Sequence, residues 1–238
     1  MGREARRGRS LGSELIRPGE PRRRCGSAAG ACPGVLLEET GFASLLRMVT
    51  DGVCEVGAGV VHPLYEHYVC LARWNRVLNL TGICQPGDIV VRHFAESLFL
   101  ASKLPEGSLS IVDAGSGAGF PGVPVAAARP ECLVTLAESD HRKAAFLRES
   151  TRLWPNVAVH FGRAEEAPQE FDWLISRGLA EKTVLRVARR RARFVAVLTG
   201  AEWVRTSCGV VDWSDAIKLP WGRDRWLLLG RVRKQGAK

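Results

Sequence analysis

The residues best suited to chemistry in this chain are the glycines of IVDAGSGAGFPG, Ile111 to Gly122. They directly follow a short apolar run that ends in Asp113. A strand that turns at once into a helix, with a ligand lying against its backbone, needs residues without a Cβ at the turn and at the contact. The segment therefore predicts a loop that binds a cofactor containing a nucleoside.

The glycine spacing fits two classes of cofactor loop. The GxGxxG of dinucleotide dehydrogenases can be read from Gly117, whereas Gly115, Gly117 and Gly119 form the GxGxG typical of S-adenosylmethionine (SAM) enzymes. The dehydrogenase pattern begins where the strand stops, which is Gly115, and its sixth position is then Phe120. Phe120 and Pro121 fit poorly where a helix N-terminus should offer N–H groups to a pyrophosphate. The register favours SAM, which has no phosphate, over an NAD(P)-dependent oxidoreductase.

A second acidic residue supports a ligand that contains adenosine. Glu138 ends the next apolar run, CLVTLAE, about 20 residues beyond the loop, where a carboxylate can meet a ribose diol. We therefore expect Glu138 to bind the cofactor together with the glycine loop.

The elements that must position these residues are short apolar runs that alternate with helical patterns after Ser108. This alternation predicts an α/β fold with a doubly wound, mostly parallel sheet whose ligand lies at the carboxyl ends of the strands. Before it, two amphipathic helices are expected over Leu64–Leu78 and from about Asp88 to Pro105. The expected strands are Leu109–Asp113, Cys132–Glu138, Val157–Phe161, Phe171–Ser176, Phe194–Leu198 and Trp226–Val232, with a helix over Asp140–Trp154.

Charge is unevenly distributed along the 238 residues, whose net charge is +9. Eight arginines and three glutamates give the first 24 residues a charge of +5, and such a basic balance favours a polyanionic partner such as RNA. With few large apolar residues, residues 1–34 are expected to form a disordered basic tail. We expect residues 35–107 to form a helical N-terminal region and residues 108–238 the SAM-binding domain.

The seven cysteines are scattered, without CxxC or Cys/His ligand spacing, and are expected to be reduced thiols with no metal site. No apolar run approaches the roughly 18 residues of a membrane helix, and the N-terminus lacks the apolar segment of a secretory signal. These features predict a cytoplasmic protein without a membrane partner, which we expect to be a monomer.

The chain resembles the RsmG (glucose-inhibited division protein B, GidB) family between about His62 and Val232. The motifs occur in the family's order: WNRVLNLTG, VRHFAESL, IVDAGSGAGFPGVPVAAARP, RKAAFLRE, GRAEE, ISR and LPWGRDRWLLL. This resemblance implies a class I SAM-dependent methyltransferase with a seven-stranded type of sheet. It also implies that the enzyme methylates N7 of a guanine in bacterial small-subunit (16S) rRNA, acting on free rRNA or on a 30S ribosomal particle.

The resemblance also implies roles for particular residues. The family's cofactor contacts fall on Gly115, Phe120, Ala164, Glu165 and Arg177. Phe120 is expected to pack on the cofactor, the Ala164 to Glu165 backbone to edge the adenine, and Arg177 to face the methionine carboxylate or an RNA phosphate.

The family's basic pair near the RNA entrance falls on Arg92 and His93, although His93 could equally be a core histidine. Arg177, His93 and Arg92 are thus the positioning candidates of the site. We assign no catalytic acid or base, because guanine N7 has a lone pair and no proton to remove.

The sequence departs from the family pattern at Gly178 and Leu179, where the family has Ala-Phe, and at Thr199, where it has Lys. The segment between Leu179 and Pro220 is also short. These departures leave open an alternative, a non-catalytic or altered-specificity RNA-binding relative of the family.

Overall fold

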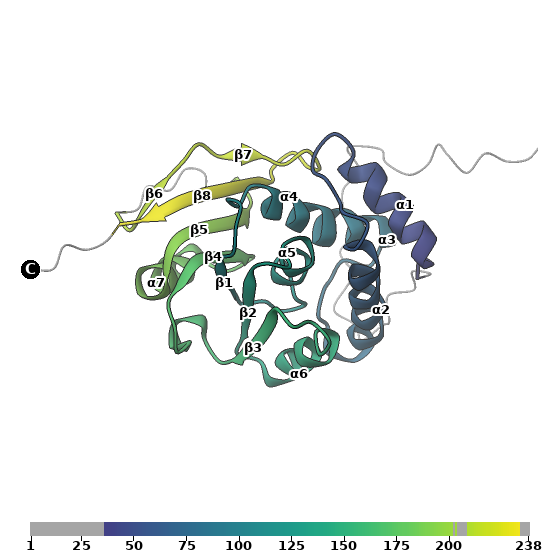
Figure 1. Cartoon of the computed structure of the whole chain (residues 1–238), viewed down its shortest axis with the longest axis horizontal. Helices are drawn as coiled ribbons and strands as arrows, with labels where there is room; N and C mark the ends of the chain where they lie inside the picture. The colour runs from purple at the N-terminus through teal and green to yellow at the C-terminus, as the bar shows by residue number, and fades with distance from the viewer. Residues whose placement is uncertain (1–35, 202, 204–208, 234–238) are drawn as a thin grey trace, which may run out of the picture.

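The computed structural model describes residues 36–201, 203 and 209–233 and has a central sheet with helices on both faces (Figure 1). The strand order is β3-β2-β1-β4-β5-β8-β6, with β7 beside β8. The strands are β1 (Ser110–Ala114), β2 (Leu133–Glu138), β3 (Val157–Phe161), β4 (Phe171–Arg177), β5 (Ala192–Thr199), β6 (Val211–Trp213), β7 (Ile217–Lys218) and β8 (Trp226–Val232).

Strands β1 to β5 pair in parallel, and β8 pairs antiparallel with β5, β6 and β7. The chain leaves β1 toward β2 and β3 and then returns to place β4 on the other side of β1. Such a reversal opens a crevice at the carboxyl ends of the two central strands, which is where doubly wound sheets bind ligands. The expected doubly wound, mostly parallel α/β fold is confirmed.

The helices are distributed unequally over the two faces of the sheet. Helices α4, α5 and α6 cover one face, with α1 and α2 outside them, and α7 covers the other (Figure 1). The helical elements are α1 (Glu39–Thr50), α2 (Val61–Leu78), α3 (Pro86–Ile89), the π-helix η1 (Val90–Ala95), α4 (Glu96–Ser102), α5 (Gly122–Ala128), α6 (His141–Ser150), the 3₁₀ helix η2 (Ala164–Glu166) and α7 (Glu181–Arg191).

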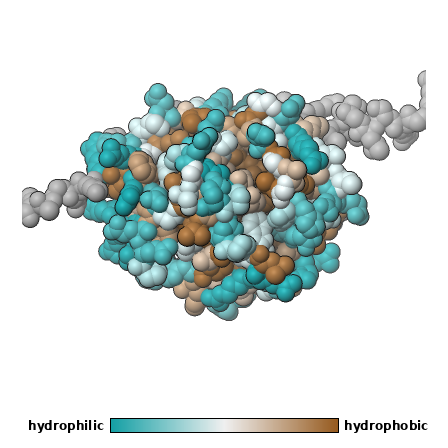
Figure 2. All heavy atoms as spheres, viewed as in Figure 1, coloured by the Kyte–Doolittle hydropathy of each residue, from teal (hydrophilic) through white to brown (hydrophobic). Residues whose placement is uncertain are grey.

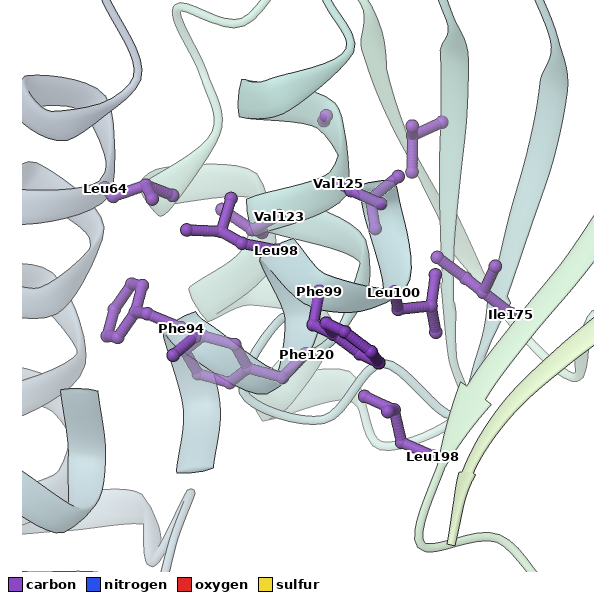
Figure 3. Packing of buried hydrophobic residues seen from close by; sticks show 14 of the residues in the cluster. Leu64, Phe94, Leu98, Phe99, Leu100, Phe120, Val123, Val125, Ile175 and Leu198 are labelled. Carbon is purple, nitrogen blue, oxygen red and sulfur yellow. The ribbon is translucent and has the colours of Figure 1, made fainter. Parts of the chain in front are cut away.

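Side chains that alternate along the strands belong to two hydrophobic cores. Ile175 and Leu198 point toward the helices around Phe94 and Phe120 (Figure 3), whereas their neighbours Leu174 and Val197 belong to the core under α7. This alternation follows from the period of two in a strand. The first core is continuous from α1 to β8, so the N-terminal helices and the sheet share one hydrophobic interior.

The face drawn in Figure 2 has its hydrophobic residues in small, separate patches, with hydrophilic residues predominating around α7. Of the described helices, none is both long enough and apolar enough to cross a membrane.

The structure confirms the six expected strands within two residues at each end. The expected helix over Leu64–Leu78 is α2, and the helix expected over 140–154 is the shorter α6, whose Asp140 side chain caps it by accepting the N–H groups of Arg142 and Lys143. The helix expected from Asp88 is divided into α3, η1 and α4, because the middle part is a wider π turn. Sequence reasoning did not predict α1, β6 or β7.

Two further expectations concern the N-terminal tail and the cysteines. The tail expected over residues 1–34 lies outside the described residues. The expectation that all seven cysteines are reduced is wrong at Cys84, which is disulfide-bonded, while Cys54, Cys70 and Cys132 are free thiols.

Candidate functional site

Three predicted site residues lie level with one another at the carboxyl edge of the sheet. Ala114 in β1 pairs with Ala137 in β2 and with Ser176 in β4. The residue that follows each of these is Gly115, Glu138 or Arg177. Adjacent parallel strands in this register bring together the loop, the acidic residue and the arginine that the sequence placed far apart.

Two of the loop glycines are enclosed by side chains, whereas a third faces open space. Gly115 (φ +68°) and Gly119 (φ +88°) are tightly enclosed, because an added Cβ would lie 2.8 Å from Leu179 Cδ2 or 2.7 Å from Val123 Cγ2. Gly117 (φ +55°) faces open space, since its nearest neighbour would be the Gly115 carbonyl oxygen at 3.8 Å. Gly117 is therefore the loop position with room for a ligand against the backbone.

Glu138 is joined to that open position. Its carboxylate accepts hydrogen bonds from the Gly117 N–H (2.9 Å) and the Asp140 N–H (2.8 Å), and the residue is 8% exposed. A carboxylate has about four acceptor positions, so two remain for hydroxyl donors. The placement fits the ribose diol that was predicted as its ligand.

The N–H groups around the N-terminus of α5 already donate hydrogen bonds within the protein. The Gly122 N–H donates to Asp113 Oδ2 (2.9 Å), and the N–H groups of Phe120 and Val123 donate to loop carbonyls of Ser116 and Gly119. A pyrophosphate would need such N–H groups free. This geometry argues against the dinucleotide register and for a cofactor without phosphates.

Asp113 is fully buried, and its Oδ1 atom has no hydrogen-bond partner among the described residues. Burial raises the pKa of this carboxyl to about 7, although the Gly122 N–H opposes the shift. An unpartnered carboxylate oxygen beside the loop is suited to a cationic group, and both the sulfonium and the ammonium of SAM are cationic. The residues present therefore fit SAM.

A pocket of about 620 Å³ opens beside Arg177 at the same edge of the sheet. Its wall is made by η1, the turn after β4, the end of β5 and the segment before β8. The lining residues are Ile83, Arg92, His93, Arg177, Gly178, Leu179, Ala180, Val197, Leu198, Thr199, Gly200, Trp203 and Arg225.

The π-helix η1 carries Arg92 and His93, which both line this pocket. Single π turns occur often at functional sites, because the wider turn changes the direction of neighbouring side chains. Four residues after Arg92, the buried Glu96 contacts the Arg92 Nε atom at 3.1 Å. The structure thus places the predicted basic pair at a pocket beside the glycine loop.

His93 is only 4% exposed, so it is a core histidine that also reaches the pocket. Its Nε2 atom lies 2.8 Å from the Thr81 hydroxyl, and its ring stacks on Phe120 with centroids 4.6 Å apart. Burial, followed by the charges of Arg177 and Arg92, holds the pKa of His93 well below its usual value. His93 is therefore neutral near pH 7.

Arg177 is oriented by two contacts. Its Nη1 donates to the Arg92 carbonyl, and its Cζ lies 5.3 Å from the centre of the Phe120 ring. Desolvation lowers the pKa of Arg177 to about 10, so the guanidinium stays charged. The Phe120 ring is 2% exposed among these protein groups, and its expected contact with SAM stays a prediction.

Ala164 and Glu165 lie in η2, on the face of the sheet that α7 covers. Glu165 Oε1 accepts a hydrogen bond from Arg186 Nε (2.9 Å), and the Glu165 carbonyl accepts one from Arg191 Nε (2.9 Å). These contacts hold η2 against α7. The adenine-edging role of the Ala164 to Glu165 backbone stays a prediction.

The three residues at which the sequence departs from the resembled family gather in the pocket. Gly178, Leu179 and Thr199 all line it, and the Leu179 side chain also packs against Gly115. The departures therefore concern the pocket more than the glycine loop. In the part of the chain that the structure describes, no group of three His, Cys, Asp or Glu side chains could hold a metal ion.

Comparison with known proteins identifies one matching family. The family GidB, rRNA small subunit methyltransferase G, matches residues 62–193. A ribosomal RNA small subunit methyltransferase G from Nitrosomonas europaea is 43% identical over 148 residues, which cover 58% of this chain and 68% of that protein. Proteins of the same name from Xanthomonas euvesicatoria (39% identity, 51% and 58% coverage) and Methylobacillus flagellatus (38%, 57% and 69%) are also similar.

Solved structures are similar only at low identity. A SAM-dependent methyltransferase from Aquifex aeolicus has a TM-score of 0.48 at 14% identity, covering 61% of this chain and 93% of that one. Fibrillarin from Aeropyrum pernix with bound S-adenosyl-L-methionine has a TM-score of 0.45 at 18% identity, with 53% and 68% coverage.

Proposed function

The chain belongs to the rRNA small subunit methyltransferase G family, and from this premise we propose that it methylates guanine N7 in bacterial small-subunit (16S) rRNA, with SAM as the methyl donor. The observation that carries this proposal is the level arrangement of Gly115, Glu138 and Arg177 beside one pocket. The pocket volume of about 620 Å³ lies within the range of roughly 300–1,000 Å³ of small-molecule sites.

The residues that would hold SAM are the loop with its open position at Gly117, Glu138 for the ribose and Asp113 for a cationic group. When bound, SAM would supply the methyl group attached to its sulfonium sulfur, and the sulfur would keep the electron pair of the carbon–sulfur bond. These residues would bind and orient SAM, and none of them needs to gain or lose a proton during methyl transfer.

Guanine N7 has an in-plane lone pair and no proton, so its methylation requires no general base. The protein's contribution is positioning, which can supply several kcal/mol by holding two reactants in line. Arg177 lies where the cofactor loop and the pocket meet, and its planar fork can fix one partner relative to the other. The neutral His93 adds no positive charge beside a guanine that becomes cationic.

The basic lining of the pocket, with Arg92, Arg177 and Arg225, favours a polyanionic substrate such as RNA. The test is to map N7-methylguanosine in 16S rRNA from cells with and without this gene. We expect one modified guanine to disappear and to return when the purified protein and SAM are added to that rRNA or to 30S particles. The efficiency on each of the two preparations identifies the natural substrate.

A second candidate is a relative that binds RNA without methylating it. The observation in its favour is that Gly178, Leu179 and Thr199 all line the pocket. In that case SAM would bind weakly or not at all while RNA binding persisted. Calorimetric titration with SAM, beside a gel-shift titration with 16S rRNA, separates the two functions.

A further inference from the structure

Arg225 comes from the segment just before β8 and lines the pocket. Its Nε and Nη2 atoms donate to the two carboxylate oxygens of Glu96, at 3.1 and 2.5 Å. This bidentate pair fixes one edge of the guanidinium plane. The other edge, with Nη1, makes no hydrogen bond within the described residues, so it remains available to a ligand.

Glu96 is fully buried at the start of α4, and the Arg225 side chain is 16% exposed. The same carboxylate contacts Arg92 Nε, so one negative charge lies between two guanidinium groups. Arg177, which lines the same pocket, has no carboxylate within ion-pair distance among the described residues. The pocket is therefore rich in positive charge and suited to an anion.

We propose that Arg225, held by Glu96, binds a phosphate group of the RNA nucleotide whose guanine enters the pocket. A planar guanidinium matches the two oxygens of a phosphate, and a partner that fixes its other edge reduces the entropy lost on binding. Each nucleotide of RNA carries a phosphate on either side of its ribose. This inference rests on the proposed function only in assigning the phosphate to RNA.

The test compares two probes that differ only in phosphates, guanosine and guanosine 3′,5′-bisphosphate. Both are titrated into the purified full chain by calorimetry, with and without SAM. We expect the bisphosphate to bind about tenfold or more tightly than guanosine, as charge-assisted hydrogen bonds allow. In Arg225→Gln the two probes should bind alike, and Arg225→Lys should keep part of the preference.

The matched control is Arg193→Gln. Arg193 is an arginine of β5 that pairs with Asp172 and is 66% exposed, near the opposite end of that strand from the pocket. This variant should keep the full preference for the bisphosphate. A preference that survives in Arg225→Gln overturns the proposal, and so does a preference lost equally in Arg193→Gln.

Two further outcomes keep the result decisive. If Arg225→Gln does not fold because Glu96 is left buried with less compensation, equal binding of the two probes to the wild type still refutes the phosphate site. If the wild type methylates 16S rRNA without preferring the bisphosphate, this inference fails alone. If SAM does not bind, the proposed function fails, whereas the titrations without SAM still decide the phosphate site.

Discussion

The Nε2 atom of His67 in α2 lies 2.9 Å from the carbonyl oxygen of Ala118 in the glycine loop. His67 is fully buried, and its ring also contacts Phe120 and Phe146. The carbonyl has no proton to give, so the imidazole must be the donor, and this fixes the tautomer with hydrogen on Nε2. Helix α2 thereby holds the glycine loop in place.

His67→Leu should weaken SAM binding about tenfold, because the loss of a buried donor leaves the Ala118 carbonyl unsatisfied. His67→Gln, which can still donate an N–H at a similar reach, should recover most of the affinity. Calorimetric titration with SAM measures both variants. Equal affinities for the two variants would show that His67 fills space without positioning the loop.

His67 also predicts how stability depends on pH. Burial lowers its pKa to about 4, whereas an unfolded histidine titrates near 6.5. Below about pH 6.5 the unfolded chain binds a proton at this histidine, whereas the folded chain does not bind it until about pH 4. The contribution of His67 to the free energy of unfolding is therefore fully present above about pH 6.5 and falls as the pH is lowered toward 4. Between pH 7.5 and 5 the loss from His67 should be about 2 kcal/mol.

Urea unfolding of the wild type and of His67→Gln at both pH values measures this loss. The variant should lose less stability than the wild type on acidification, by roughly that amount. Parallel losses in the two proteins would contradict the buried, neutral histidine.

Asp113 predicts the opposite dependence of stability on pH. With its pKa raised to about 7, the folded protein without ligand keeps a proton that the unfolded chain has lost, and its stability falls as the pH rises from about 4 to 7. A cationic ligand favours the ionised carboxylate. SAM affinity should therefore rise up to about tenfold between pH 6 and 8.

In Asp113→Asn, which can still accept the Gly122 N–H, this dependence should be flat. SAM titrations at pH 6, 7 and 8 compare the two proteins. A wild-type slope that persists in the variant would assign the titrating group elsewhere.

Gly117→Val should abolish SAM binding while the fold is retained, because the new side chain enters the open space beside Glu138. The positive φ of +55° adds a strain of about 1–2 kcal/mol. Gly107→Val is the matched control, since Gly107 also has a positive φ (+99°) with open space around it, in the loop before β1. That control should lose similar stability and bind SAM normally. SAM affinity like the wild type's in Gly117→Val would remove the loop from the cofactor site.

Arg177→Lys should keep the charge, lose the planar fork and lower the rate of methyl transfer by at least about tenfold. The melting temperature should fall by a few degrees at most. Arg193→Lys provides the comparison at an exposed arginine on the neighbouring strand. If Arg177→Lys methylates 16S rRNA at the wild-type rate, Arg177 has no part in positioning.

Six of the eight strands could be predicted because each is a short apolar run between turn residues. Their parallel order then placed Gly115, Glu138 and Arg177 at one edge of the sheet. Helix α1 was missed although Phe42, Leu46 and Val49 follow helical spacing. The Arg225–Glu96 pair could not be predicted, since it joins residues 129 positions apart. The sequence likewise offered no sign that the Phe120 ring lies beneath Arg177 and stacks on His93.

The Glu96–Arg225 contact has a consequence for the order in which the site forms during synthesis. The ribosome completes the glycine loop, Glu138 and Arg177 before it adds the residues that precede β8. One wall of the pocket is therefore still missing when the residues of the glycine loop have already been made. On the role proposed for Arg225, the phosphate contact can form only after Arg225 has left the exit tunnel and docked on a helix made more than a hundred residues earlier.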